Sequence, residues 1–186
     1  MTVIGPDGQP RCGWATSAPE YVEYHDNEWG KAIRDDVALF ERMTLEGFQS
    51  GLSWITILRK RENFRAAFAH FDPAIIAKYD GADFDRLMAD PGIVRNRLKI
   101  NATISNARAL LELDEGEFTE LLWSVRPAKH KAPKTFADVP ATTPESVALS
   151  KALKKKGFVF VGPTTAYALM QATGIVNDHL SICIAR

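Results

Sequence analysis

The sequence contains only two cysteines, Cys12 and Cys183, and they stand almost at opposite ends of its 186 residues. So few cysteines exclude a disulfide-rich secreted scaffold, and a disulfide between the two is not expected in a reducing compartment. Two interpretations remain open at this point: two unrelated buried thiols, or two ligands of a metal ion.

Other absences narrow the class of protein further. No apolar run approaches the roughly 20 residues that span a bilayer, so a membrane protein is excluded. The first residues lack the basic start and apolar core of a secretory signal, so we expect a cytoplasmic protein with a flexible arm over residues 1–10. The formal net charge is zero, so any nucleic-acid surface must be local. The length suits one compact domain, expected over residues 11–186.

Helical spacing of apolar residues dominates the chain, and the predicted class is all-α. Ser17 and Glu20 have the spacing of a capping box, with Pro19 beside them, and predict a helix that ends at Gly30. Further helices are expected after Asp35, from Ser53, after Asp72, over residues 83–89, 93–113, 118–123 and 144–156, from Thr164 to Gly174, and over residues 176–183. The apolar run 158–162 is too short for an independent strand, and we place it as a tight turn between two helices.

The cysteines and two of the four histidines have the spacing of a metal site. Twelve residues separate Cys12 from His25, and three separate His179 from Cys183. On a helix, His179 and Cys183 would face the same ion, and two cysteines with two histidines form a closed tetrahedral set suited to zinc. Four protein ligands leave no position for a reacting water, so we predict one structural Zn²⁺ per chain that joins the two ends.

Aromatic residues are concentrated near the start of the chain, and a carboxylate lies between large apolar residues of a predicted helix in the same stretch. The set consists of Trp14, Tyr21, Tyr24, Trp29 and Trp54, with Glu46 on the intervening helix. An enzyme that acts on a nucleobase holds the base between aromatic faces, and a carboxylate among such rings favours a cationic, alkylated base. The alternative is an aromatic core in which Glu46 is hydrogen-bonded to backbone.

The segment Gly157–Gly162 predicts a hairpin between two helices. Backbone N–H groups at the start of the second helix, near Thr164, are suited to a DNA phosphate, and Lys154 belongs to a run of lysines beside them. Many helix pairs turn on glycine, so the pattern alone is of moderate specificity.

Taken together, the ordered motifs resemble the bacterial 3-methyladenine DNA glycosylase I family over about residues 11–183. The matching blocks are Cys12-Gly13-Trp14, residues 24–30 (YHDNEWG), 45–54 (LEGFQSGLSW), 60–63 (KREN), 149–155 (LSKALKK), 157–162 (GFVFVG) and 176–179 (VNDH).

This resemblance implies a helix-hairpin-helix DNA glycosylase that removes 3-methyladenine from alkylated double-stranded DNA and leaves an abasic site, without lyase activity. Members of that family bind zinc at the positions of Cys12, His25, His179 and Cys183. Their base pocket corresponds to Glu46, Tyr24, Trp14, Tyr21, Trp29 and Trp54, with Glu46 and Tyr24 in the catalytic role. Leu52 matches the position that fills the gap left by the extracted base. The resemblance also implies a bacterial protein that is associated with the nucleoid when it acts. A monomer is expected, and Asp178 is given no catalytic role.

Without the resemblance, two other functions fit the same residues. One is a zinc-stabilised DNA-binding module without chemistry, and the other is a small helical regulator that binds an aromatic ligand. Release of free base from alkylated DNA separates an enzyme from both.

Overall fold

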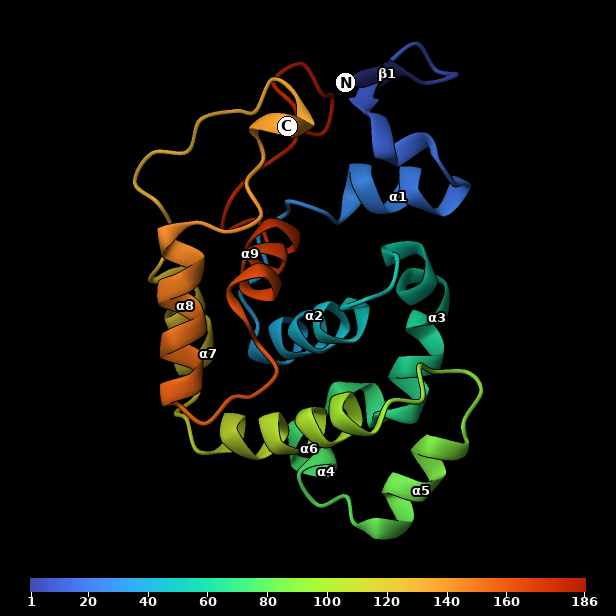
Figure 1. Ribbon diagram of the computed structural model, residues 1–186, viewed down its shortest axis with the longest axis vertical. Coiled ribbons are helices and arrows are strands. Elements are labelled where there is room, and N and C mark those ends of the chain that lie inside the picture. The colour runs from blue at the N-terminus through green and yellow to red at the C-terminus, as the bar shows by residue number, and fades with distance from the viewer.

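The computed structural model describes residues 1–186 and consists of nine α-helices and one small sheet (Figure 1). Strand β1 (Thr2–Ile4) pairs antiparallel with β2 (Pro10–Cys12). The helices are α1 (Pro19–Asn27), α2 (Asp36–Gln49), α3 (Trp54–Ala67), α4 (Pro73–Ile76), α5 (Gly81–Ala89), α6 (Arg97–Leu111), α7 (Glu117–Trp123), α8 (Pro144–Lys155) and α9 (Pro163–Ala172), with short 3-10 turns at η1 (Gly13–Thr16), η2 (Ala69–Phe71) and η3 (Phe136–Asp138). The chain is therefore helical, as predicted. None of these helices combines the length and apolar character needed to cross a membrane.

Polar side chains define where several helices begin. Asp35 accepts a hydrogen bond from the first turn of α2, Asn96 does the same for α6, and Thr143 for α8. Each cap satisfies a backbone N–H group that the helix itself leaves without a partner, and contributes about 1 kcal/mol. Because Asn96 caps α6, that helix begins at Arg97 and not at Ile93, where the apolar pattern begins.

The predicted capping box of α1 is wrong. The N-cap is Ala18, which offers no side-chain acceptor, and the helix begins at Pro19. The Ser17 hydroxyl donates back to the Trp14 carbonyl at 2.7 Å, so it is not available to the helix. Proline supplies the start instead, because its fixed φ suits the first helical position.

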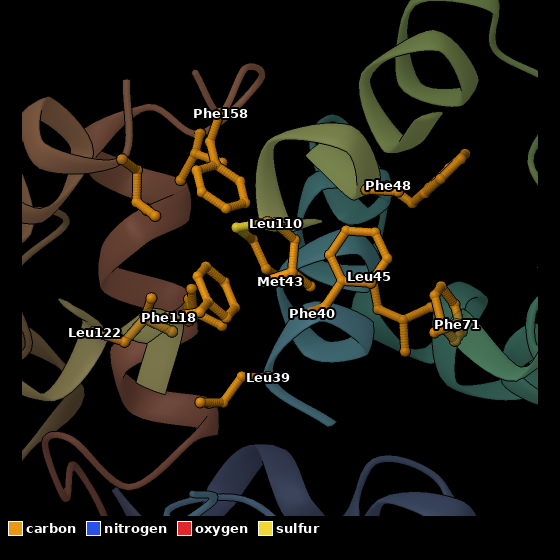
Figure 2. Close-up of a cluster of buried hydrophobic side chains, with 14 of the residues drawn as sticks. Leu39, Phe40, Met43, Leu45, Phe48, Phe71, Leu110, Phe118, Leu122 and Phe158 are labelled. Carbon is orange, nitrogen blue, oxygen red and sulfur yellow. The ribbon is translucent and has the colours of Figure 1, made fainter. Parts of the chain in front are cut away.

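Helix α2 lies at the centre of the molecule, and the main apolar core forms around it (Figures 1 and 2). Figure 2 shows its large side chains meeting those of the surrounding helices: Leu39, Phe40, Met43, Leu45 and Phe48 from α2 face Phe71, Leu110, Phe118, Leu122 and Phe158. Full burial of a side chain of this size contributes about 1.5–3 kcal/mol. Such packing fixes the position of α2, and with it the position of any functional group that this helix contributes.

The two ends of the chain lie at the same end of the molecule (Figure 1). A small apolar cluster there contains Cys12, Leu180, Cys183 and Ala185. The first ten residues, expected as a flexible arm, contain β1 and the first residue of β2. Buried Arg11 extends this contact, because its guanidinium pairs with Asp26 of α1 at 2.7 Å.

The helix predicted over residues 176–183 does not form. Helix α9 ends at Ala172, and Gly174 turns the chain with a φ of 73°. Beyond it, the Asn177 side chain accepts a hydrogen bond from the His179 N–H at 3.2 Å, a local bond that competes with helical pairing. The segment follows a series of turns, yet His179 Nδ1 and Cys183 Sγ still lie 3.6 Å apart.

Candidate active site and metal centre

A cavity of about 300 Å³ opens between the start of the chain and helices α2, α3 and α9. Its lining comprises Trp14 of η1, Tyr21 and Tyr24 of α1, and Trp29 of the segment between α1 and α2. Glu46 and Gln49 of α2, Trp54 of α3, and Ala168 and Gln171 of α9 complete it. The volume is at the lower end of the range for small-molecule sites, and apolar rings with a few polar groups are the usual lining of such sites. The six residues predicted to form the base pocket all line this one cavity. Leu52, the seventh predicted substrate-binding residue, does not.

The pocket rings support one another edge to face. Trp14 meets Tyr21 with ring centroids 5.4 Å apart and Trp29 at 5.3 Å, both close to perpendicular. The Tyr24 and Trp54 rings also pack together, at a tilt of 42° with centroids 5.3 Å apart. Edge-to-face pairs are favourable beyond their buried area. The walls therefore form a rigid aromatic slot before any ligand enters.

Glu46 contributes the only carboxylate of the pocket lining and lies only 6% exposed. Burial raises its pKa to about 7, and the positive charge of Arg42 opposes that rise without reversing it. No hydrogen bond to backbone or side chain holds the carboxylate, so the alternative of a structurally satisfied Glu46 is not supported. A desolvated carboxylate without a partner is expected to bind a donor or a cation strongly.

Tyr24 stands beside Glu46 as a second polar group of the cavity. Burial raises the pKa of its phenol well above the ordinary value, so the hydroxyl stays protonated. Its oxygen accepts a hydrogen bond from Arg42 at 3.4 Å. The pocket therefore presents a hydrogen-bond acceptor and a phenolic hydroxyl side by side.

The second candidate site lies behind the first, where the chain ends meet. Cys12, His25, His179 and Cys183 are all buried, and their ligand atoms lie within 4.8 Å of one another. His25 Nε2 is 3.1 Å from His179 Nδ1 and 3.3 Å from the Cys183 sulfur, and Cys12 lies 3.9 Å from His179 Nδ1. Ligand atoms about 2.0–2.3 Å from one tetrahedral ion are separated by such distances. The cluster can therefore hold a metal ion.

Surrounding groups orient both imidazoles toward the centre of the cluster. The other nitrogen of His25 meets Asp26 at 2.7 Å, and that of His179 meets the Trp29 carbonyl at 2.9 Å. These bonds leave His25 Nε2 and His179 Nδ1 as the inward donors, which is the usual outer arrangement of metal-bound histidine. The Leu180 N–H points at the Cys12 sulfur at 3.3 Å, and burial raises the pKa of that thiol to about 12, so a bound cation would supply the charge that favours the thiolate.

The two sites share walls. The Trp14 ring lies 5.1 Å from His25, and the Trp29 ring lies 4.7 Å from His179, measured between centroids. Two rings of the cavity therefore rest on two imidazoles of the metal cluster.

The hairpin between α8 and α9 is a turn without strands, as predicted. Gly157 has a φ of 88°, and Phe160 also lies in the left-handed region with a φ of 61°. The buried side chain of Asn106 holds the turn from α6, because it accepts from the Val159 N–H at 2.7 Å and donates to its carbonyl at 3.0 Å.

The start of α9 offers free donors to a ligand. Gly162 is its N-cap and supplies no side-chain hydrogen bond, and Thr164 lies in the first turn. Lys154 is exposed in the last turn of α8, before the hairpin, whereas Lys156 is paired with Glu117. Uncapped N–H groups with a nearby lysine suit a phosphate.

Leu52 lies outside the cavity, on the turn between α2 and α3, with its side chain 42% exposed. Lys99 of α6 supports this turn, because its buried ammonium donates to the carbonyls of Phe48 and Ser50. These carbonyls would otherwise be unpaired at the end of α2.

Sequence patterns missed several residues of the site. Gln49 and Gln171 line the cavity, and Arg42 lies beneath it. Gln49 follows Glu46 by three residues and so shares its helix face, a signal that was available. Gln171 offered no signal, because only the packing of α9 against α2 places it there.

Comparisons with known proteins assign the chain to a family. The methyladenine glycosylase family profile matches residues 14–186. The DNA-3-methyladenine glycosylase 1 of Escherichia coli K12 is 51% identical over 178 residues, which is 93% of this chain and 95% of that protein. A crystal structure of a 3-methyladenine DNA glycosylase I superposes with a TM-score of 0.90 at 48% identity, covering 95% of this chain and 99% of the other.

A further solved structure contains a ligand. It is a variant of a 3-methyladenine DNA glycosylase I in complex with 3-methyladenine, 36% identical to this chain with a TM-score of 0.88, and the match covers 94% of this chain and 96% of that one. Profile, sequence and fold agree over nearly the whole length. The chain therefore belongs to the methyladenine glycosylase family.

Proposed function

We propose that this protein hydrolyses the N-glycosidic bond of 3-methyladenine in alkylated double-stranded DNA, releasing the free base and leaving an abasic site. The observation that carries the proposal is the Glu46 carboxylate, which is buried without a hydrogen-bond partner in a pocket of aromatic rings. A neutral base would leave that charge poorly compensated. A base made cationic by methylation compensates it and stacks on the rings.

The chemistry demands little from acid catalysis. Methylation at N3 places a positive charge on adenine, so the electron pair of the breaking C1′–N9 bond neutralises the departing base. Water then adds to the sugar carbon and loses a proton. Glu46 stabilises the cationic character of the bound nucleotide, and Tyr24 contributes its hydroxyl to the same base. Trp14, Tyr21, Trp29 and Trp54 stack around the base and exclude water.

The base must leave the duplex to reach this cavity, because the walls enclose it on several sides. Leu52 is proposed to fill the space left in the stack, and its exposure on a turn that Lys99 supports is compatible with this role. The helix-hairpin-helix unit of α8 and α9 binds the phosphate backbone through the turn from Gly157 to Gly162, the N–H groups near Thr164, and Lys154. The protein acts as a monomer in this scheme.

The ion of the second site is proposed to be zinc, held by Cys12, His25, His179 and Cys183. When bound, it fastens the chain ends and has no part in the reaction, because four protein ligands leave no open position.

Release of free base tests the function. DNA treated with a methylating agent is incubated with the protein, and the soluble fraction is analysed for 3-methyladenine by chromatography. Wild type is expected to release the base in proportion to time, whereas Glu46→Gln is expected to lose about 10²-fold or more in rate. Tight binding of alkylated DNA with no base in solution would instead support a binding module. Full activity of Glu46→Gln would contradict the role given to this carboxylate.

A further inference from the structure

Arg42 is an arginine buried beneath the base pocket, and its role is not given by the proposed function. It lies one turn before Glu46 on α2 and is only 7% exposed. Its guanidinium donates to the Tyr24 hydroxyl oxygen at 3.4 Å and to the Glu28 carboxylate at 3.2 Å. It also lies 5.4 Å from the centroid of the Tyr24 ring and 5.9 Å from that of Trp54.

A second arginine shares the only carboxylate that pairs with Arg42. Arg61 of α3 forms a two-pronged bond with Glu28, at 2.8 Å to one oxygen and at 2.5 Å to the other. Two guanidinium groups thus divide one negative charge. The positive charge of Arg42 is consequently only partly neutralised by Glu28, and part of its field is available to other groups nearby.

Glu46 is the group on which that field acts. Arg42, on the same helix, is the charged group that acts on Glu46. Tyr24 of α1 interacts with both of them, and also with Glu28, which follows α1, and with Arg61 of α3. Helix α9 contributes only the neutral Ala168 and Gln171 to the cavity. Tyr24 is protonated, so Arg42 is the principal charge that favours the ionised form of Glu46 against desolvation.

Arg42 also constrains the direction of the Tyr24 proton. A guanidinium has only donors, so the phenol oxygen must accept from it, and the phenol hydrogen must point elsewhere. The Tyr24 hydroxyl donates to no protein group in the structure, since its contact with Arg42 is its only hydrogen bond. That hydrogen is therefore available to a base in the pocket.

We propose that Arg42 is a positioning residue for the base pocket, which favours the ionised form of Glu46 in the free protein and commits the Tyr24 hydroxyl to donate to the base. This inference rests on the proposed function, because it names what prepares the pocket for a cationic purine. It adds a cation, held by Glu28, that does not touch the substrate.

Titration of the Glu46 carboxyl tests the proposed effect of Arg42 on Glu46 without any enzymatic turnover. Protein labelled with ¹³C at the glutamate carboxyls is titrated by NMR, and the Glu46 signal is assigned by its absence in Glu46→Gln. Arg42→Met, which keeps an unbranched apolar side chain but removes the charge, is expected to move the Glu46 midpoint to higher pH by about one unit. Glu28→Gln leaves both guanidiniums without their shared carboxylate and is expected to move the midpoint to lower pH. The opposite signs cannot both arise from loosened packing.

The same variants are followed by the pH dependence of kcat/KM for base release, which reports groups of the free enzyme. Because wild-type Glu46 titrates at about pH 7, Arg42→Met is expected to lose about fivefold at pH 7 and to recover by pH 9. Arg65→Met is the control, since Arg65 is on α3 and pairs with Glu41 at 2.7 Å. If Arg42→Met does not fold, Glu28→Gln carries the test. Midpoints that coincide with wild type in the folded variants would overturn the inference.

The proposed effect of Arg42 on the Tyr24 hydroxyl is tested by a double-mutant cycle. The measured quantity is the affinity for free 3-methyladenine, followed by tryptophan fluorescence at pH 9. In wild type, Tyr24→Phe is expected to weaken binding about fivefold, the effect of one lost hydrogen bond. In the Arg42→Met background the loss should be clearly smaller, and equal losses would overturn the orienting role. If the midpoints move as expected but wild type releases no base, the proposed function fails while the effect of Arg42 on Glu46 stands.

Discussion

Glu46 is a residue at which function and stability oppose each other. Its pKa in the folded protein is about 7, above the ordinary 4.5, so the fold favours the protonated form. The folded state therefore binds more protons than the unfolded state between about pH 4.5 and pH 7, and this group makes stability fall as the pH rises through that window. Above pH 7 the destabilisation is complete and amounts to about 3 kcal/mol at most.

Replacing Glu46 with glutamine removes this cost, so Glu46→Gln is expected to be more stable than wild type at pH 8 while losing activity. The gain in the free energy of unfolding should be about 1–3 kcal/mol at pH 8 and should vanish near pH 4. Urea denaturation at both pH values measures it. Glu62→Gln, at an exposed site on α3, is the control. An equal gain at both pH values would show that ionisation is not the cause.

At the scale of elements, the hairpin between α8 and α9 depends on one side chain of a third helix. The Asn106 amide pairs with both backbone groups of Val159, and Asn106→Ala leaves them without that partner. The turn should loosen, at a cost of about 1–3 kcal/mol. Affinity for duplex DNA containing an abasic site is expected to fall about three- to tenfold, whereas affinity for free 3-methyladenine is unchanged. Asn101→Ala, on an exposed position of the same helix, serves as control. Parallel loss of both affinities would mean that Asn106 acts on the whole fold and not on the hairpin.

Elements with a local cause could be predicted from the sequence, and those with a distant cause could not. Asp35 before an apolar helical pattern gives the start of α2, and the glycines at 157 and 162 delimit the hairpin. The helix expected over residues 176–183 is absent because the Asn177 side chain bonds to backbone and Gly174 turns the chain. The predicted proximity of His179 and Cys183 is nevertheless confirmed. Turns, like helices, can bring residues four positions apart into contact.

The candidate site divides in the same way. The metal cluster could be predicted because both cysteines have histidines at ligand spacing, and the ligand atoms of Cys12, His25, His179 and Cys183 do converge. Arg42 was overlooked because a charged residue in an amphipathic helix is usually solvated. Its burial depends on Glu28, which follows α1, and on Arg61 of α3, and no pattern within α2 encodes them.

At the scale of the whole molecule, the cluster of cysteines and histidines connects the chain ends to the base pocket. Residues 12 and 183 enclose nearly the entire chain, so a bond between them removes much of the freedom of the unfolded state. The pocket rings Trp14 and Trp29 lie against His25 and His179. Loss of the proposed zinc should therefore disturb the pocket directly, because Trp14 and Trp29 form part of its walls.

Removal of the metal is expected to lower both stability and base affinity. Closing a loop of this length contributes about 5 kcal/mol by the chain-entropy argument, which corresponds to about 10–20 °C in Tm for a protein of this size. Elemental analysis should find one zinc per chain. Cys183→Ser should lose the metal, and its melting temperature and its affinity for 3-methyladenine should both fall. Ser181→Ala alters an exposed neighbour and should leave all three unchanged. Wild-type protein that contains no metal yet melts like a zinc-loaded sample would contradict the proposal that zinc joins the chain ends. A Cys183→Ser protein with lower Tm but intact base affinity would show that the metal stabilises the fold without supporting the pocket. The contacts of Trp14 and Trp29 with the imidazoles favour joint loss, because each ring would then pack against a histidine that no longer has a fixed position.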